Sequence, residues 1–175
     1  MPRKLTAVLA AIAFVATVYL ANWLVLNVGP VRVWPTSLLA PAGVYVVGLA
    51  FLLRDTVQRF GGQLLALAAI VAGTALSTIV SPSLAFASGA AFAVSELVGL
   101  LLFLLLGGTT GGRARTGIAV ATASVVAAAA DSYVFLSLAP LPLSFFPGQV
   151  VAKVCVTLVA LPFVLTARRR LVPAT

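Results

Sequence analysis

The stretch from Gly117 to Leu138, GIAVATASVVAAAADSYVFLSL, is the part of the chain that decides the fold class. As a helix rising about 1.5 Å per residue it would be roughly 33 Å long, enough to cross the hydrocarbon core of a bilayer. Asp131 is its only charged residue. The whole chain is 62% hydrophobic and 8% charged, whereas a soluble domain carries roughly 25% charged residues. The sequence therefore predicts an all-α integral membrane protein.

Six apolar stretches have about the length that a spanning helix needs. They cover residues 5–28, 37–54, 62–81, 84–106, 117–138 and 145–166. Prolines and glycines separate them, and we expect Pro41 and Gly43 to break the second helix near its outer end. The first stretch is too long for the core of a signal peptide, so we interpret it as a retained helix. The prediction is one domain, residues 1–175, formed by a single bundle of six transmembrane helices.

The basic residues predict the orientation of these helices. If both ends of the chain share one side, that side carries Arg3, Lys4, Arg54, Arg59, Arg113, Arg115, Arg168, Arg169 and Arg170. The other side carries only Arg32, and Lys153 lies within a span. The excess of basic residues on cytoplasmic loops then places both termini in the cytoplasm, with the protein in the plasma membrane. Since the basic residues follow the ends of apolar runs and form no water-exposed face, nucleic-acid binding is not expected.

Polar side chains inside the apolar stretches predict an interior site. From the helical rise, Asn22 lies roughly 9 Å below the outer end of its span, Asp131 roughly 10 Å and Lys153 roughly 12 Å. Gln149 precedes Lys153 by four residues and shares its helix face. We expect these four side chains to surround a central cavity in the outer half. Asp131 and Lys153 match in depth and differ in sign, so they are expected to form an ion pair of structural or functional use.

Glu96 is the third ionisable residue within a span, and it lies deeper, roughly 18 Å from the outer end. It has no obvious cationic partner in the sequence. Phe92 and Gly99 lie on the same helix face, which thus combines a carboxylate, an aromatic surface and a gap. Small-molecule sites are mostly apolar with a few orienting polar groups. We expect Glu96 to contact a substrate or a proton; the other interpretation is a protonated, hydrogen-bonded structural glutamate.

The residue inventory argues against metal, cofactor and enzyme chemistry. The chain has no histidine, three acidic residues and the single cysteine Cys155, so we predict no zinc, haem or iron–sulfur site and no other cofactor. It also lacks a pair of acids on one helix that could share acid–base work. The prediction is that the protein is not an enzyme.

The polar positions also follow the order seen in a known family. The matching pieces are Asn22, Pro41 to Gly43, Leu53 to Gly61, Ala85 to Gly89, Ser95 to Leu97, Asp131 and Ser132 with Phe135, and Gln149 with Lys153 and Pro162. In these pieces the chain resembles the vitamin-uptake-like transporter family, which includes the bacterial queuosine-precursor transporters. The resemblance implies a six-helix fold similar to the substrate-binding components of energy-coupling-factor vitamin importers. It also implies uptake of a deazaguanine base or a related small molecule. The chain departs from the family pattern at Arg59 and Gly99, where acidic residues are usual.

Two function classes follow from these features. The first is an importer that binds its small-molecule substrate through Glu96, Gln149, Asn22, Phe92, Asp131 and Lys153. In this hypothesis Glu96 accepts the adjacent N–H groups of a guanine-like edge. Energy would come from the importer's own conformational cycle or from an energising membrane complex that acts as its partner. The alternative is a non-transport assembly or regulatory subunit, in which the buried charges only fix helix packing.

Overall fold

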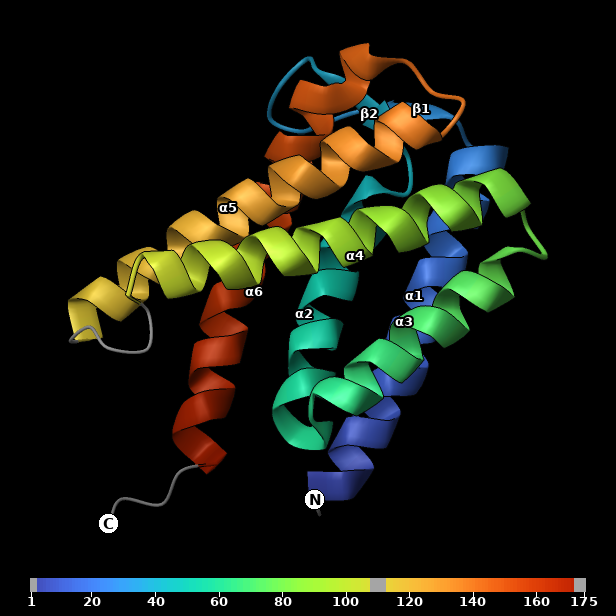
Figure 1. Ribbon diagram of the computed structural model, residues 1–175. Helices are drawn as coiled ribbons and strands as arrows, with labels where there is room; N and C mark the ends of the chain where they lie inside the picture. Colours follow the sequence, from blue (N-terminus) through green and yellow to red (C-terminus); the bar gives the residue numbers. More distant parts are fainter. Residues whose placement is uncertain (1–2, 108–112, 172–175) are drawn as a thin grey trace.

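The computed structural model describes residues 3–107 and 113–171. Six α-helices make up most of this part of the chain, which confirms the predicted all-α class (Figure 1). They are α1 (Arg3–Asn27), α2 (Val44–Gly61), α3 (Gln63–Ser77), α4 (Pro82–Leu105), α5 (Arg113–Leu138) and α6 (Phe146–Leu171). A short antiparallel hairpin of β1 (Pro30–Arg32) and β2 (Leu39–Pro41) joins α1 to α2, and the 3₁₀ turn η1 (Leu143–Phe145) precedes α6.

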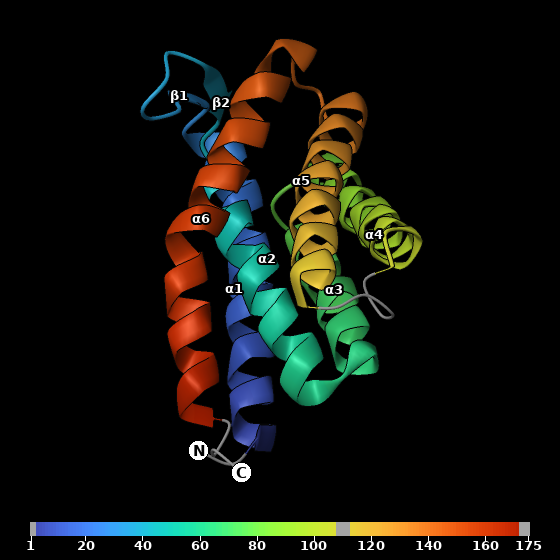
Figure 2. The same cartoon turned by 90° about the vertical axis from the view of Figure 1, so that its left-hand side faces the viewer.

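The helices form two groups that cross each other. In Figure 1, α1, α2 and α6 stand upright, with the hairpin at one end and both Arg3 and Leu171 at the other. The long antiparallel pair α4 and α5 runs obliquely across them, and Figure 2 shows α4 nearly end-on and α5 foreshortened. The most extensive helix contacts lie within the pair α4–α5 and between α1 and α2. Helix α6 packs against both α2 and α5 and so links the two groups.

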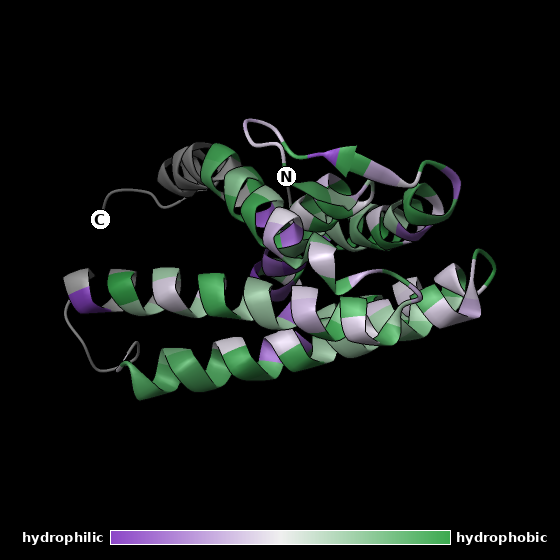
Figure 3. Ribbon diagram, turned by 90° about the horizontal axis from the view of Figure 1, so that it is seen from above, coloured by the Kyte–Doolittle hydropathy of each residue, from purple (hydrophilic) through white to green (hydrophobic). Residues whose placement is uncertain are grey.

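The hydropathy of the helices fits a membrane environment. Among the described residues, α1, α4 and the segment Ala121–Leu138 of α5 are long and apolar enough to cross a membrane. Helix α3 and the segment Leu143–Val156 are apolar but shorter. Hydrophobic colouring dominates the helices in Figure 3. The protein is therefore an integral membrane protein with an all-α fold.

The predicted second span, residues 37–54, is wrong in its bounds. The helix runs from Val44 to Gly61, seven residues further along the chain, because the preceding segment forms the hairpin, in which Pro30 pairs with Pro41. Pro41 has no N–H to donate to a helix. At Gly43 an added Cβ would lie 2.4 Å from the carbonyl oxygen of Ala21, so the chain packs tightly on α1 before α2 begins. Pro41 and Gly43 thus precede the helix and do not break it.

The other predicted spans agree with the helices more closely. The largest remaining differences are at the end of α6, which lies at Leu171 and not at residue 166, at the start of α5, which lies at Arg113 and not at residue 117, and at the end of α3. This helix ends at Ser77, before the predicted residue 81. Ser81 instead caps α4, since its side chain accepts a hydrogen bond from the backbone N–H of Leu84 at 3.4 Å, with Pro82 in the first turn. The glycine-rich stretch of residues 107–112, which separates the fourth predicted span from the fifth, lies outside the described residues apart from Gly107.

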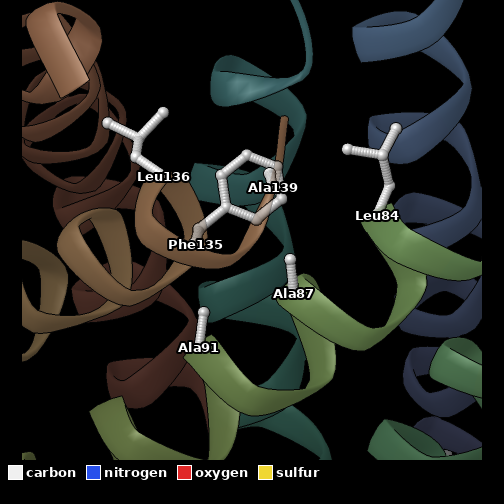
Figure 4. Packing of buried hydrophobic residues seen from close by; sticks show 6 residues of the cluster. All are labelled: Leu84, Ala87, Ala91, Phe135, Leu136 and Ala139. Carbon is white, nitrogen blue, oxygen red and sulfur yellow. The ribbon is translucent and has the colours of Figure 1, made fainter. Parts of the chain in front are cut away.

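Two packed clusters fix the helices around the site. One joins α4 to α5, and Figure 4 shows Ala87 and Ala91 of α4 pointing towards Phe135 of α5. Such small residues let helices approach closely where no hydrophobic effect drives them together. The other cluster joins four helices through Phe14, Val18, Ala50, Ala69 and Phe92.

Candidate functional site

A small cavity lies between five helices near the hairpin end of the protein. Its volume is about 30 Å³, which is space for about two water molecules. Apolar side chains that include Val25, Val44 and Phe135 make up part of its wall. Its polar lining comes from α1, α4, α5 and α6 and consists of Asn22, Ser88, Asp131, Gln149 and Lys153. The expected convergence of Asn22, Asp131, Gln149 and Lys153 is therefore confirmed.

The Lys153 ammonium is the most densely bonded group of the cavity wall. Its Nζ donates to Asp131 Oδ2 at 2.5 Å, to Ser132 Oγ at 2.8 Å and to Gln149 Oε1 at 3.2 Å. Only 2% of Lys153 and 3% of Asp131 are exposed. An ammonium offers three donors, so this charge is held by hydrogen bonds within the protein. The predicted ion pair is thus confirmed, and it ties α5 to α6 at the cavity.

The Asn22 side chain adds a second polar group to the cavity lining. Its Oδ1 accepts a hydrogen bond from Ser88 Oγ at 2.8 Å, while its buried Nδ2 has no partner within the described part of the chain. Which end of the Asn22 amide is nitrogen and which is oxygen is assigned from the surrounding groups. In either orientation, one of the two polar atoms has no hydrogen-bond partner among the described residues. An unsatisfied buried polar group costs about 1–3 kcal/mol. A polar molecule in the cavity would remove that cost.

Glu96 lies outside the cavity lining, and the expectation that it lacks a cationic partner is wrong. Its carboxylate forms an ion pair with Arg54 of α2. The two side chains are 18% and 17% exposed, respectively. Arg54 was expected at a cytoplasmic helix end, but the later start of α2 places it ten residues into that helix. The corrected position of α2 therefore brings a cation to the level of Glu96.

Phe92 lies between the cavity and this second ion pair. It lines the cavity, and its ring contacts Phe14 with a centroid separation of 5.6 Å and Phe51 with one of 5.4 Å. Phe92 precedes Glu96 by four residues on α4, and Phe51 precedes Arg54 by three on α2. Residues at these spacings share a helix face. An aromatic layer thus separates the two polar groups.

Sequence reasoning missed two hydroxyl groups of the site. Ser88 binds Asn22, and Ser132 binds the Lys153 ammonium. Both lie in pieces that carry the family resemblance. However, a lone serine in a membrane helix gives no signal of its own, since its hydroxyl usually bonds to the backbone of its own helix. Each serine could have been identified by searching for a hydroxyl at the same depth as a buried polar residue of another helix, to which it can hydrogen-bond.

The fold and the cavity define the class: an all-α membrane protein with a partly polar cavity between its helices. Residues 78–167 match the family described as "Putative vitamin uptake transporter". The match covers 90 of the 175 residues, just over half, and the chain belongs to this family. The matched segment includes Phe92, Asp131, Gln149 and Lys153, whereas Asn22 lies before it. No curated protein and no solved structure matches the chain.

Proposed function

We propose that this protein imports a small molecule across the plasma membrane and binds it in the cavity of the outward half. Its six helices would cross the membrane as one domain, with both termini in the cytoplasm. One observation carries the proposal: polar side chains from four helices meet around one cavity within an apolar protein. Buried polar groups are expensive in lipid and are usually kept for function. The family match supports uptake as that function.

The substrate we propose is a queuosine precursor or a related deazaguanine base. The cavity pairs one negative with one positive charge, which suits a ligand with little net charge. A carboxylate can accept several hydrogen bonds, so Asp131 would take the N–H edge of the base while it holds Lys153. The amides of Asn22 and Gln149 would bond to the remaining polar edge, and Phe92 would cover a ring face. Glu96 is left out of this site because Arg54 holds it behind the aromatic layer.

The size of the cavity implies that the helices move during uptake. Space for about two water molecules cannot admit a bicyclic base. The structure therefore corresponds to a closed state, and binding must widen the gap between the helices that line the cavity. The energy for the cycle would come from the protein alone or from an energising membrane complex. Isolation of the protein from native membranes, with a search for an ATPase-linked scaffold, separates these two sources.

Ligand-induced stabilisation tests the binding site. A ligand at 100 times its Kd stabilises the folded state by about 2.7 kcal/mol, which a thermal unfolding assay with a series of deazaguanine bases would detect. We expect Asn22→Ala to weaken the affinity roughly fivefold, the equivalent of about 1 kcal/mol for one hydrogen bond. Asn27→Ala is the matched control, because Asn27 is an exposed residue of the same helix that bonds to the Trp23 carbonyl. Equal affinity in both variants would remove Asn22 from the site.

The alternative, an assembly or regulatory subunit, has one observation in its favour. The acceptors Asp131, Ser132 and Gln149 around the Lys153 ammonium belong to the protein itself, as in a structural network. In that account no base stabilises the wild-type protein at any concentration. The same thermal assay therefore decides between the two functions.

A further inference from the structure

We infer that Phe14, Phe51 and Phe92, together with the ion pair Arg54–Glu96, form an inner gate that closes the cavity towards the Arg3 end of the protein. The inference rests on the proposed transport function, because a gate has a use only where a substrate passes. It assigns to Arg54 and Glu96 a task separate from substrate binding.

The order of residues along two helices places the gate. On α2 the cavity-lining Val47 is followed by Phe51 and then by Arg54. On α4 the cavity-lining Phe92 is followed by Glu96. Because α2 runs from the hairpin end towards the Arg3 end (Figure 1), the aromatic layer lies next to the cavity and the ion pair lies beyond it.

The aromatic layer provides the barrier. Phe14 of α1 is fully buried, and Phe92 is 3% exposed. The Phe14 and Phe92 rings meet edge to face at an interplanar angle of 69°, and Phe51 contacts Phe92 at 55°. Three rings from three helices thus meet directly beneath the polar cavity. A polar solute can pass this layer only if the rings separate.

The ion pair fastens the barrier. It joins α2 of the upright group to α4 of the oblique pair, and beyond the aromatic layer itself, where Phe51 meets Phe92, these two helices pack little against each other. The two groups meet instead mainly through α5 with α6, and α3 bridges them by packing against α1 and α4. Breaking one ionic link would therefore let α2 and α4 separate without dismantling a large packed interface.

Arg54 also has neighbours on its own helix that can accept its hydrogen bonds in an open state. Its Nη1 lies 3.4 Å from Asp55 Oδ1 and 3.4 Å from Gln58 Oε1, both on its own helix. Its buried Nε has no hydrogen-bond partner within the described residues, so Glu96 does not engage the full guanidinium fork. The guanidinium can thus release Glu96 and remain paired on α2, which gives the link two discrete arrangements.

Reagent access to the cavity from the Arg3 side tests the gate. In a Cys155→Ser background, Val44→Cys places a thiol in the cavity wall without adding volume. A small charged thiosulfonate is added to sealed vesicles that expose the Arg3 end, and labelling is normalised to that by a membrane-permeant thiol reagent. We expect little labelling in this parent and a roughly fivefold increase with Glu96→Gln, the factor for losing a partly exposed ion pair.

Three further variants make the test specific. Arg54→Gln should raise labelling as Glu96→Gln does, and the exchange Arg54→Glu with Glu96→Arg should restore protection. Arg59→Gln is the matched control, because Arg59 is an exposed arginine of the same helix whose guanidinium lies over the Phe60 ring, and it should leave labelling unchanged. No increase with either Glu96→Gln or Arg54→Gln would overturn the gate.

The readout separates this inference from the proposed function, since labelling requires no ligand. Ligand binding without the labelling pattern would contradict the gate alone. The labelling pattern in a protein that binds no base would support the gate and contradict the proposed substrate.

Discussion

Removing one member of the Asp131–Lys153 pair should destabilise the protein far more than removing both. Breaking a buried ion pair by deleting one partner typically costs about 3–5 kcal/mol, because the remaining charge is left uncompensated. Both residues are at most 3% exposed, so water gives the remaining charge little relief. For Lys153→Met we expect a loss near 4 kcal/mol, a value near the middle of that range. For Asp131→Asn we expect a smaller loss, about 3 kcal/mol, because Ser132 and Gln149 still accept from the ammonium.

The double variant Asp131→Asn with Lys153→Met carries no charge at this position. Replacing a whole buried pair by neutral groups of similar volume is often close to neutral in stability. We expect a total loss of about 2 kcal/mol from the hydrogen bonds that disappear, and thus a coupling energy of roughly 5 kcal/mol between the two sites.

Equilibrium unfolding in mixed detergent micelles would give the free energies of unfolding of the wild type, the two single variants and the double variant. Lys4→Met is the control for loss of an exposed lysine. The reasoning would be refuted if the two single losses simply added in the double variant.

Two further predictions concern the walls of the site. Gly43→Ala should lower the free energy of unfolding by about 1–3 kcal/mol, because the added Cβ would lie 2.4 Å from the carbonyl oxygen of Ala21. Thermal unfolding measures this loss, and an unchanged unfolding midpoint would contradict the close packing of Gly43 on α1. Phe92→Ala should cost about 3–5 kcal/mol through its lost aromatic contacts, whereas the control Phe86→Ala, at a position 66% exposed, should cost less than 1 kcal/mol. Equal losses in these two phenylalanine variants would show that the aromatic layer is not packed as described.

The sequence predicted those parts of the site that depend on depth alone. The helical rise put Asp131 and Lys153 at one level, and a buried charge needs an opposite charge nearby. This reasoning works because α5 and α6 pack directly against each other. Asn22 and Gln149 were found in the same way, since their spans begin close to the expected positions.

The sequence could not predict Arg54 as the partner of Glu96. Hydropathy alone extended the second span back to residue 37, because the hairpin segment is apolar as well. The hairpin forms because Pro30 and Pro41 cannot donate helical hydrogen bonds and β1 can pair with β2. The close pairing of α4 with α5 was likewise not predictable, since it depends on how alanines on α4 meet Phe135 of α5. Such contacts depend on side-chain shape and not on hydropathy.

Uptake in cells tests the central claim most directly. The wild-type protein would be expressed in cells that cannot make the deazaguanine precursor, supplied with that precursor outside, and transfer-RNA queuosine would be measured. The account predicts that queuosine reappears with the wild-type protein and with Asn27→Ala, and that its rate of appearance falls with Asn22→Ala at limiting precursor. Absence of queuosine in cells whose membranes contain the folded wild-type protein would contradict the proposed import of this substrate.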